Sequence, residues 1–496
     1  MSMQAAVRDV SAPPSFLATP RGKLTLAFLC LVGFLDFVDA SIINVALPSI
    51  RRDLGFSVQS LQWVLSGYLL TYGGFMLLGG RAADLLGRRR ILVAGILVFA
   101  LSSLTGGLAA DAGMLVGARL VQGLGAAMML PAALSILTTT FNEGADRNKA
   151  LGAWGAMAGL ASAVGVFLGG VLSEGPGWRW VLWVNLPVCA FLLVAAFRLV
   201  SGERRDAPPK SFDALGAFLV TSAMLLLVYT LVEAPDVGWG TTRTIAGLVG
   251  VGTLLAAFVA NEHRHPSPLV PLAIFRIPGL AAANATQVIA IAGFYSMFFF
   301  LTLYMQSVLG FSQIQAGAAY LPATLGVAIA SGIASQLFSR IGTRPIIAAG
   351  ALLSAGAVYW LAQIPVGGSY LTDLLPGLLI MSFGLGAVFV GVTTAANAGV
   401  PADKAGLAAA LINSSTWIGG ALGLAIFSVI ATSRTQHLLA THAPPTDALT
   451  SGFQRALTAC SIFLLAAAVI ALRATNTRGE PIESPALEAV PAAENA

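Results

Sequence analysis

Long apolar runs, separated by short links rich in glycine, proline or charge, dominate the pattern of the chain. A helix needs about 20 mostly apolar residues to cross the hydrocarbon core of a bilayer. The runs predict helices because only helices and closed barrels satisfy the backbone in lipid, and barrel strands would be short and alternating. Fourteen runs fit this length: residues 24–47, 62–82, 91–110, 114–137, 150–172, 180–200, 214–232, 244–260, 281–305, 316–338, 345–364, 372–396, 404–430 and 452–472.

The composition excludes the ordinary soluble classes of protein. Hydrophobic residues make up 57% of the 496 residues and charged residues only 10%, whereas an average soluble domain has about 25% charged residues. We therefore expect an all-α polytopic membrane protein embedded in the lipid bilayer. No basic run is typical of nucleic-acid binding, and Cys30, Cys189 and Cys460 lack metal-ligand spacing. We expect no nucleic-acid partner, no metal and no cofactor.

Lysine and arginine residues predict the orientation, because they concentrate in the cytoplasmic loops of membrane proteins. Arg119 falls inside a predicted span, and six arginines fall at one set of helix ends. All the other members of the 27 lysines and arginines fall at the opposite ends, so we expect both termini to be cytoplasmic. The six outer arginines are Arg51, Arg52, Arg179, Arg243, Arg434 and Arg455.

A weak internal repeat divides the predicted helices. The links after the second and tenth helices, residues 80–90 and 339–344, align one glycine and one arginine, but Ser339 stands where the first link has Asp84. Such repeats are common in secondary transporters and predict two six-helix halves. The predicted divisions are a cytoplasmic tail 1–23, a first half 24–200, linkers with two extra helices 201–280, a second half 281–473 and a disordered tail 474–496.

Two aspartates, Asp36 and Asp39, lie inside the first apolar run. A charged side chain at the bilayer centre costs about 2.5–3.5 kcal/mol or more, so an intramembrane carboxylate marks a functional site. At a rise of 1.5 Å per residue, Asp39 lies about 13 Å inside the helix end at Pro48. Arg119 lies about 9 Å inside the start of the fourth helix at Gly113, which is a similar depth.

Several motifs resemble those of the major facilitator superfamily, and in particular its fourteen-helix drug:proton antiporters. Residues 80–90 are similar to the signature loop of the superfamily, and residues 115–125 resemble its fourth-helix motif. The resemblance implies the major facilitator fold and the export of small amphipathic or cationic compounds in exchange for protons across a bacterial cytoplasmic (inner) membrane. Further matching segments are residues 39–48, 178–180, 185–187 and 304–312.

The fifth helix departs from the antiporter motif. The family pattern has Gly-Pro, two residues and Gly-Gly, whereas Val166 replaces the proline between Gly165 and the pair Gly169 and Gly170. The glycines predict close helix packing, but the kink that a proline introduces is missing. Symport or uniport of a metabolite therefore stays open beside antiport.

The resemblance assigns proton coupling to Asp36, Asp39 and Arg119, because the first and fourth helices of the family line one cavity. Their similar depths then predict an ion pair between Arg119 and an aspartate. Burial favours the neutral form of a carboxyl group and a nearby arginine favours the charged form, so a conformational change can switch protonation. A permanent ion pair that only holds the helices together is the alternative interpretation.

The same resemblance predicts a gating loop made of Gly80, Asp84, Gly87, Arg88 and Arg90. Asp84 is expected at the N-terminal end of the thirteenth helix, near Ala405, where the helix dipole favours a carboxylate. Positive-inside charge alone is the alternative explanation of the arginines. Residues expected to line the substrate cavity have aromatic or amide side chains, which suit amphipathic ligands, although packing could explain each of them: Asn44, Tyr68, Gln122, Tyr295, Phe298, Tyr304 and Asn413.

The sequence thus predicts a monomeric secondary transporter that uses the proton motive force and works by alternating access. Its expected partners are protons and a small-molecule substrate. No nucleophile elbow, zinc motif, phosphate-binding loop or large soluble domain is visible, so we expect no enzyme. A membrane enzyme or a sensor is the remaining alternative class.

Overall fold

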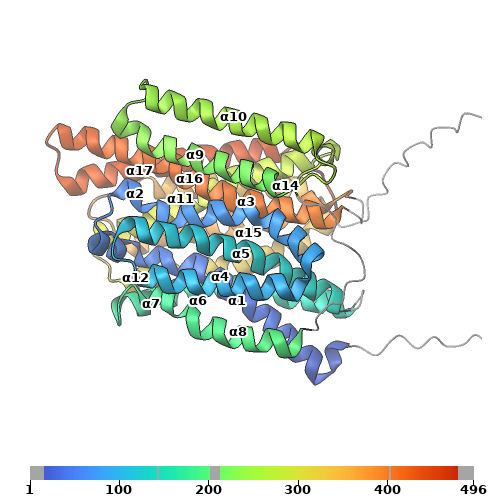
Figure 1. Ribbon diagram of the computed structural model, residues 1–496. Coiled ribbons are helices and arrows are strands. Elements are labelled where there is room, and N and C mark those ends of the chain that lie inside the picture. Colours follow the sequence, from blue (N-terminus) through green and yellow to red (C-terminus); the bar gives the residue numbers. More distant parts are fainter. Residues whose placement is uncertain (1–15, 142–144, 201–212, 401–403, 479–496) are drawn as a thin grey trace, which may run out of the picture.

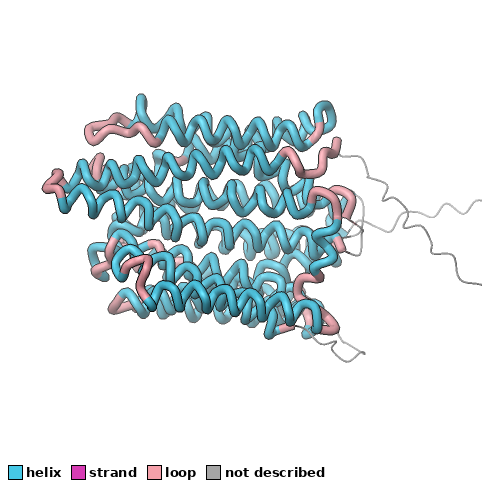
Figure 2. The backbone as a smooth tube through the Cα atoms, turned by 90° about the horizontal axis from the view of Figure 1, so that it is seen from above, coloured by secondary structure: helices cyan, strands magenta, loops and turns pink. Residues whose placement is uncertain are grey.

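The computed structural model describes residues 16–141, 145–200, 213–400 and 404–478, and this part of the chain contains helices and no strands. The helices lie side by side, and the loops collect at the two ends of the bundle (Figures 1 and 2). The helices that form the bundle are α1 (Pro20–Leu54), α2 (Val58–Leu61), α3 (Trp63–Leu86), α4 (Arg88–Gly107), α5 (Ala112–Thr140), α6 (Ala145–Glu174), α7 (Trp180–Trp183), α8 (Asn185–Leu199), α9 (Ala214–Val237), α10 (Thr242–Arg264), α11 (Leu280–Ser307), α12 (Gln313–Ala319), α13 (Leu321–Ile341), α14 (Thr343–Leu361), α15 (Leu375–Asn397), α16 (Ala405–Ala440) and α17 (Pro445–Ala471).

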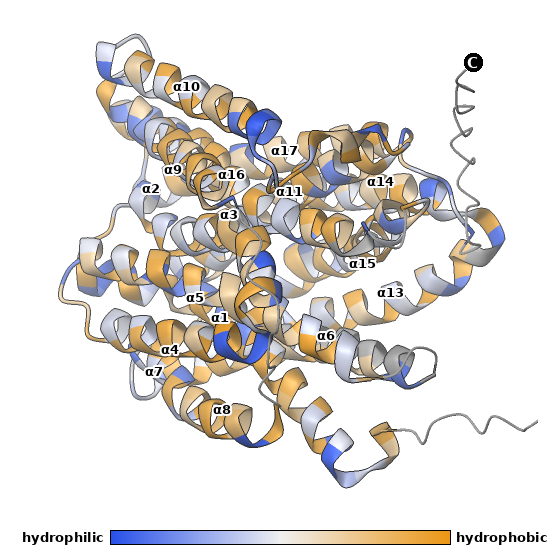
Figure 3. Ribbon diagram, turned by 45° about the vertical axis from the view of Figure 1, so that its right-hand side comes forward, coloured by the Kyte–Doolittle hydropathy of each residue, from blue (hydrophilic) through white to orange (hydrophobic). Residues whose placement is uncertain are grey.

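The prediction of an all-helical membrane protein is confirmed. Within the described residues, thirteen helical segments are long and apolar enough to cross a membrane, against the fourteen predicted. The fourteenth predicted span, 150–172, falls in α6, which is 30 residues long and whose described apolar stretch is Val164–Glu174. Apolar residues run along the lengths of the helices (Figure 3), as expected for segments surrounded by lipid and by one another.

Three predicted spans contain irregular backbone. The span 180–200 is divided between α7 and α8, and the span 316–338 between α12 and α13. The span 372–396 begins with a π-helical turn at Tyr370–Leu374 before α15. Hydropathy could not reveal these breaks, because it averages over a window and the longest break, Tyr370–Leu374, has five residues.

The helices pack in two groups with an inserted pair. Helices α1 and α3–α8 pack mainly with one another, and α11–α17 form a second group. The pair α9 and α10 lies at one edge of the bundle, where α9 contacts both α3 and α16 (Figure 1). We call the first group the first half and the second group the second half.

The two ends of the bundle are named here by a residue at each. The Asp53 end is where α1 finishes, and there Arg179 Nη1 lies 2.6 Å from Asp53 Oδ2. Trp178 Nε1 also donates to Asp53 Oδ2, at 2.9 Å. The Asp84 end is the opposite end, where α3 passes into α4.

The predicted loop 80–90 is mostly helical. Residues 80–86 form the last turns of α3, residues 88–90 form the first turn of α4, and the chain reverses at Gly87 with φ +102°. The corresponding link between α13 and α14 reverses at Gly342 with φ +85°. The prediction of a loop was wrong because polar residues mark where the membrane ends, and a helix can continue beyond that point.

The predicted tail boundary at residue 474 is also too early. Thr343 Oγ1 donates to the carbonyl of Thr475 at 2.9 Å, and the amide of Thr343 donates to the carbonyl of Thr477 at 3.0 Å. The side chain of Asn476 accepts from the amide of Arg344 at 3.1 Å. These bonds hold residues 475–477 against the α13–α14 link, and residues 479–496 lie outside the described part of the chain.

We expect Gly87→Ala to lower the unfolding free energy by about 1–3 kcal/mol, because its backbone conformation is costly for a residue with a Cβ. Space is not the reason, since an added Cβ would lie 3.9 Å from the nearest atom, in Arg90. Gly117→Ala is the matched control, because Gly117 lies in α5 and an added Cβ meets nothing within 4 Å. Thermal unfolding of the purified protein in detergent measures both variants, and equal melting temperatures would contradict the backbone argument.

Candidate functional site

Asp39 is the centre of a buried polar cluster in the first half. Its side chain is fully buried in α1, and its two oxygens accept three hydrogen bonds from charged or amide donors. Arg119 Nη1 of α5 lies 2.8 Å from Oδ2, while Gln122 Nε2 and Asn185 Nδ2 lie 2.8 Å and 2.7 Å from Oδ1. The predicted ion pair between Arg119 and an aspartate is therefore confirmed, and the aspartate is Asp39.

Arg119 extends the cluster to a third helix. Its Nε donates to the carbonyl of Val64 in α3 at 3.0 Å, and its guanidinium lies over the ring of Tyr68, 4.2 Å from the centroid. Its Nη1 also donates to Gln122 Oε1 at 2.6 Å. Nη2 has no hydrogen-bond partner among the described residues. One fully buried arginine thus connects α1, α3 and α5.

Ser103 of α4 forms the outer layer of the cluster. Its hydroxyl oxygen accepts from Gln122 Nε2 at 2.9 Å and from Asn185 Nδ2 at 3.3 Å. Each amide nitrogen therefore uses its two protons on Asp39 and on Ser103, which fixes the orientation of both amides. Helices α1, α3, α4, α5 and α8 meet in this cluster, which we call the Asp39 cluster.

Asp36 lies one turn before Asp39 and has different neighbours. Tyr68 Oη donates to Oδ1 at 2.9 Å, and Tyr72 Oη donates to Oδ2 at 2.7 Å. The carboxyl group is fully buried and its described hydrogen-bond partners are both neutral phenols. The ring of Tyr72 stacks on Trp417 of α16, with centroids 4.4 Å apart and planes 22° apart. The surroundings of Asp36 therefore extend into the second half.

The residues predicted as a gating loop take several positions. Asp84 forms an ion pair with Arg88 at 3.6 Å and accepts from Ser135 Oγ at 3.4 Å, and its side chain is 56% exposed. Both of these partners belong to the first half. Arg90 is exposed, and an added Cβ on Gly80 would lie 3.5 Å from Pro131 of α5. The predicted position of Asp84 at the start of α16 is not among its described contacts.

The three glycines predicted to pack helices do so. An added Cβ on Gly165 would lie 2.0 Å from Ser41 Oγ of α1, and one on Gly169 would lie 2.5 Å from the carbonyl oxygen of Ile42. An added Cβ on Gly170 would lie 2.7 Å from the carbonyl oxygen of Gln313, in α12 of the second half. Helix α6 therefore packs closely against α1 in its own half and against α12 in the second half. Val166 lies on the contact with α12, because an added Cβ on Gly317 would be 2.8 Å from the carbonyl oxygen of Val166.

The predicted substrate-cavity residues divide into two sets. Asn44, Tyr295, Phe298 and Asn413 are partly exposed, and the two amides donate to carbonyls of their own helices at 3.3 Å and 2.9 Å. Tyr68, Gln122 and Tyr304 are fully buried. The first two belong to the aspartate sites, and the Tyr304 hydroxyl donates to the carbonyl of Pro365. The three buried residues do not line an open cavity in this conformation, because their side chains are fully buried and form hydrogen bonds within the protein.

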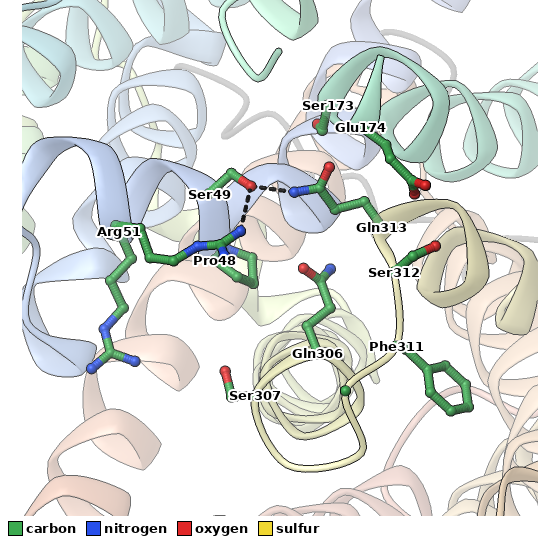
Figure 4. Close-up of a pocket in the computed structure, with 12 residues that line it drawn as sticks. Pro48, Ser49, Arg51, Ser173, Glu174, Gln306, Ser307, Phe311, Ser312 and Gln313 are labelled. Carbon is green, nitrogen blue, oxygen red and sulfur yellow. Dashed lines mark hydrogen bonds between the residues drawn. The ribbon is translucent and has the colours of Figure 1, made fainter. Parts of the chain in front are cut away.

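A cavity of about 720 Å³ opens between the halves at the Asp53 end. Figure 4 shows Gln313 of α12 pointing toward Ser49 of α1, with which it forms a hydrogen bond. Gln306 Nε2 donates to the carbonyl of Val45 at 3.0 Å, and the amide of Ile314 donates to Glu174 Oε2 at 3.1 Å. Among the described residues, every hydrogen bond between the halves lies near this end or one turn inside it, at Ser66. Direct hydrogen bonds therefore join the two halves beside this cavity, at the Asp53 end.

Sequence reasoning missed four residues of the two aspartate sites: Ser103, Tyr72, Asn185 and Trp417. A signal existed for two of them. Asn185 belongs to the segment 185–187 that carried a family resemblance, and Tyr72 follows Tyr68 by one helical turn and so shares its face. Ser103 and Trp417 are far in sequence from both aspartates, and nothing in their local pattern places them there.

A family model described as "Major Facilitator Superfamily" matches residues 29–424. The puromycin resistance protein pur8 of Streptomyces alboniger is 38% identical, over 95% of this chain and 96% of its own length. The cephamycin export protein CmcT of Amycolatopsis lactamdurans is 37% identical, over 94% and 95%. A bacterial homologue of the human lysosomal transporter Spinster, in an inward-facing and occupied conformation, matches 92% of this chain and 97% of its own, with 18% identity and a TM-score of 0.66.

We expect Arg119→Leu to destabilise the protein by about 3–5 kcal/mol, because it leaves Asp39 as a buried, unpaired carboxylate. The double variant Arg119→Leu with Asp39→Leu should recover much of this loss, since no buried charge remains at the pair. Melting temperatures in detergent measure the cycle of two single variants and one double variant. Strictly additive losses would contradict a direct interaction between the two side chains.

Proposed function

Because this chain belongs to the Major Facilitator Superfamily, whose members are membrane transporters, we propose that it exports small amphipathic or cationic compounds in exchange for protons. The single observation that carries the proposal is the fully buried group of Asp36, Asp39 and Arg119 inside a bundle of membrane-spanning helices. Charged groups in this position are expensive and mark ion or proton pathways. A purely structural protein would achieve the same packing with apolar side chains at lower cost.

Two relatives support the class of substrate. They are named for resistance to puromycin and for export of cephamycin, and each aligns with nearly the whole of this chain. Tyr295, Phe298, Asn44 and Asn413 keep exposed surface and combine aromatic with amide groups, which suit amphipathic ligands. Antibiotics or other natural products are therefore the compounds that we propose for this transporter, which has no catalytic role.

The distribution of lysine and arginine supports an orientation with the Asp84 end in the cytoplasm, in a bacterial inner membrane. In that orientation the Asp53 end, where hydrogen bonds join the halves, faces outward, and we assign the described conformation to the inward-facing state. Alternating access then requires the contacts of Ser49, Val45 and Glu174 with the second half to break when the outward cavity opens. We propose a monomer with two halves, 24–200 and 281–473, that rock about the site.

We propose that Asp84, with its partners Arg88 and Ser135, gates the cytoplasmic end. In the described conformation Asp84 pairs with Arg88 of its own half and is largely exposed. We propose that it moves onto the start of α16 when the cytoplasmic end closes, where the helix dipole would stabilise its charge. The exposed position described here is then the released state of this gate.

A second transport mode has one observation in its favour. Helix α6 runs without interruption from Ala145 to Glu174, and Val166 retains the amide that a proline would lack. If a kink in this helix is needed to separate proton and substrate pathways, the chain would transport by symport or uniport instead. The pH gradient of energised membrane vesicles separates the modes, because antiport alone makes an exported compound dissipate that gradient.

We expect some members of a panel of cationic dyes and antibiotics to collapse the pH gradient of energised everted vesicles that contain the wild-type protein. Asp39→Asn vesicles should show no such response at equal protein content, because the ion pair with Arg119 is lost. A fluorescent weak base reports the gradient, and vesicles without the protein give the background. Collapse of equal size in wild type and Asp39→Asn would contradict the role of this site.

Asp84→Asn should lower the maximal export rate and leave the relative preference among compounds unchanged, because a gate acts on the cycle and not on the binding site. Asn at this position keeps the hydrogen bond with Ser135 possible while removing the charge. Initial rates over a range of concentrations, measured for two exported compounds, test this. A change in the ratio of their rates would argue for direct substrate contact at Asp84.

A further inference from the structure

Two carboxyl groups one turn apart on α1 have different neighbours, and we infer that they have different tasks. Asp36 is the group that takes up and releases the proton, and Asp39 stays ionised with Arg119 throughout the cycle. Tyr72 and Trp417 connect Asp36 to the second half and act as positioning residues for it. This inference rests on the proposed proton antiport and assigns its steps to particular side chains.

Asp39 is fitted to remain charged. It accepts from one guanidinium on Oδ2 and from two amides on Oδ1, so a proton on Oδ2 would displace Arg119 and a proton on Oδ1 would compete with both amides. Arg119 would then be a buried cation whose described partners, the Val64 carbonyl and the Gln122 amide oxygen, are neutral. Removing one charge from a buried pair is strongly unfavourable. Asp39 and Arg119 are therefore best kept as a permanent pair.

Asp36 is fitted to change its charge. Its carboxylate is stabilised by two phenol donors, which are charge-assisted hydrogen bonds but bring no compensating cation. Protonation would leave a neutral carboxylic acid whose described hydrogen-bond partners are neutral phenols, so no buried ion loses a partner. The charged and titratable groups that face it are Asp39, Tyr68 and Tyr72, Arg119 and, from α11, Tyr295.

The proton balance of the step is simple. Uptake forms one O–H bond on Asp36, raises the charge of the site by one and involves no redox change. The new O–H occupies one carboxyl oxygen, so one tyrosine hydroxyl loses its acceptor. We assign that loss to Tyr72, because Tyr68 is also held by the Arg119 guanidinium over its ring. Release of the proton on the other side restores the bond to Tyr72.

Tyr72 carries the change to the second half. Its ring stacks on Trp417, and Tyr295 packs edge-on against the same indole with centroids 6.4 Å apart. The helices are close here, because an added Cβ on Gly73 would lie 3.0 Å from Trp417 Cβ. Trp417 is 4% exposed, and its indole N–H has no hydrogen-bond partner among the described residues. The stack therefore depends on the position of the halves, and it covers Asp36 only while they are together.

The first experiment compares Asp36→Asn with Asp39→Asn, the same substitution one turn apart, in proteoliposomes of purified full-length protein. The probe is a compound that collapses the pH gradient in wild-type vesicles. Two rates are measured: concentrative transport driven by an imposed pH gradient, and exchange of labelled for unlabelled compound at equal pH. Asp36→Asn should lose concentrative transport and keep exchange, because it resembles the protonated state. Asp39→Asn should lose both.

The outcomes separate the inference from the function on which it rests. A wild-type protein that moves no protons overturns the proposed antiport itself. If the wild-type protein moves protons and the Asp36→Asn variant still concentrates the compound, only the assignment of Asp36 as the proton carrier is overturned. Exchange retained by Asp39→Asn while concentrative transport is lost would move the carrier to Asp39. Asp36→Asn decides the question alone if Asp39→Asn fails to fold.

A second experiment tests the link through the pH profile of concentrative transport, which a merely structural role would not move. Tyr72→Phe keeps the ring but removes the donor to Asp36, so the carboxylate is less stabilised and the midpoint should shift to higher pH. Trp417→Leu removes the ring that stacks on Tyr72 and should also shift the pH profile. Trp417→Phe keeps an aromatic ring at this position and should show the wild-type profile. Unchanged midpoints in Tyr72→Phe and Trp417→Leu, with normal folding, would overturn the proposed link.

Discussion

The ion pair between Asp39 and Arg119 is the interaction on which the first half depends. In lipid the hydrophobic effect does not hold helices together, so close packing and polar contacts decide their arrangement. This pair joins α1 to α5, and the amides of Gln122 and Asn185 bring in α4 and α8. Arg119 also donates to the carbonyl of Val64 in α3. Neither charge could be buried alone, so the positions of these five helices follow from the requirement that both charges are satisfied.

Close packing of glycines makes room for this cluster and for the contact between the halves. Gly165 and Gly169 let α6 lie directly on the backbone of α1, the helix that carries both aspartates. Gly170 and Gly317 bring α6 and α12 together across the halves. The glycine run of α6 therefore helps to join the two halves, and Val166 lies within this contact. An uninterrupted α6 suits a helix that moves as a rigid body against its neighbours.

Much of the fold could be predicted because lipid imposes a simple rule on the sequence. Apolar length predicted the helices, and similar depth together with the family resemblance predicted Arg119 beside an aspartate. Hydropathy could not give the ends of the helices, since α3 continues past the polar residue Asp84 to Leu86. It also could not reveal which distant residues face each other, and Ser103 and Trp417 were missed for that reason. Their contacts arise from helix packing, which the local pattern of apolar and polar residues does not determine.

The buried charges are distributed unequally, and this constrains any coupling mechanism. Within the described residues, the buried charged side chains are three in the first half, Asp36, Asp39 and Arg119, and two at the inserted helices, Asp213 and Glu262. The described second half contributes none. No buried charge of the described second half can therefore respond to protonation in the first half. The response must come from changes in side-chain packing and hydrogen bonding. The stacked rings of Tyr72 in α3 and Trp417 in α16 form the described contact between the halves that lies nearest to Asp36. Under the proposed mechanism, the second half responds to a proton through the packing of these neutral rings.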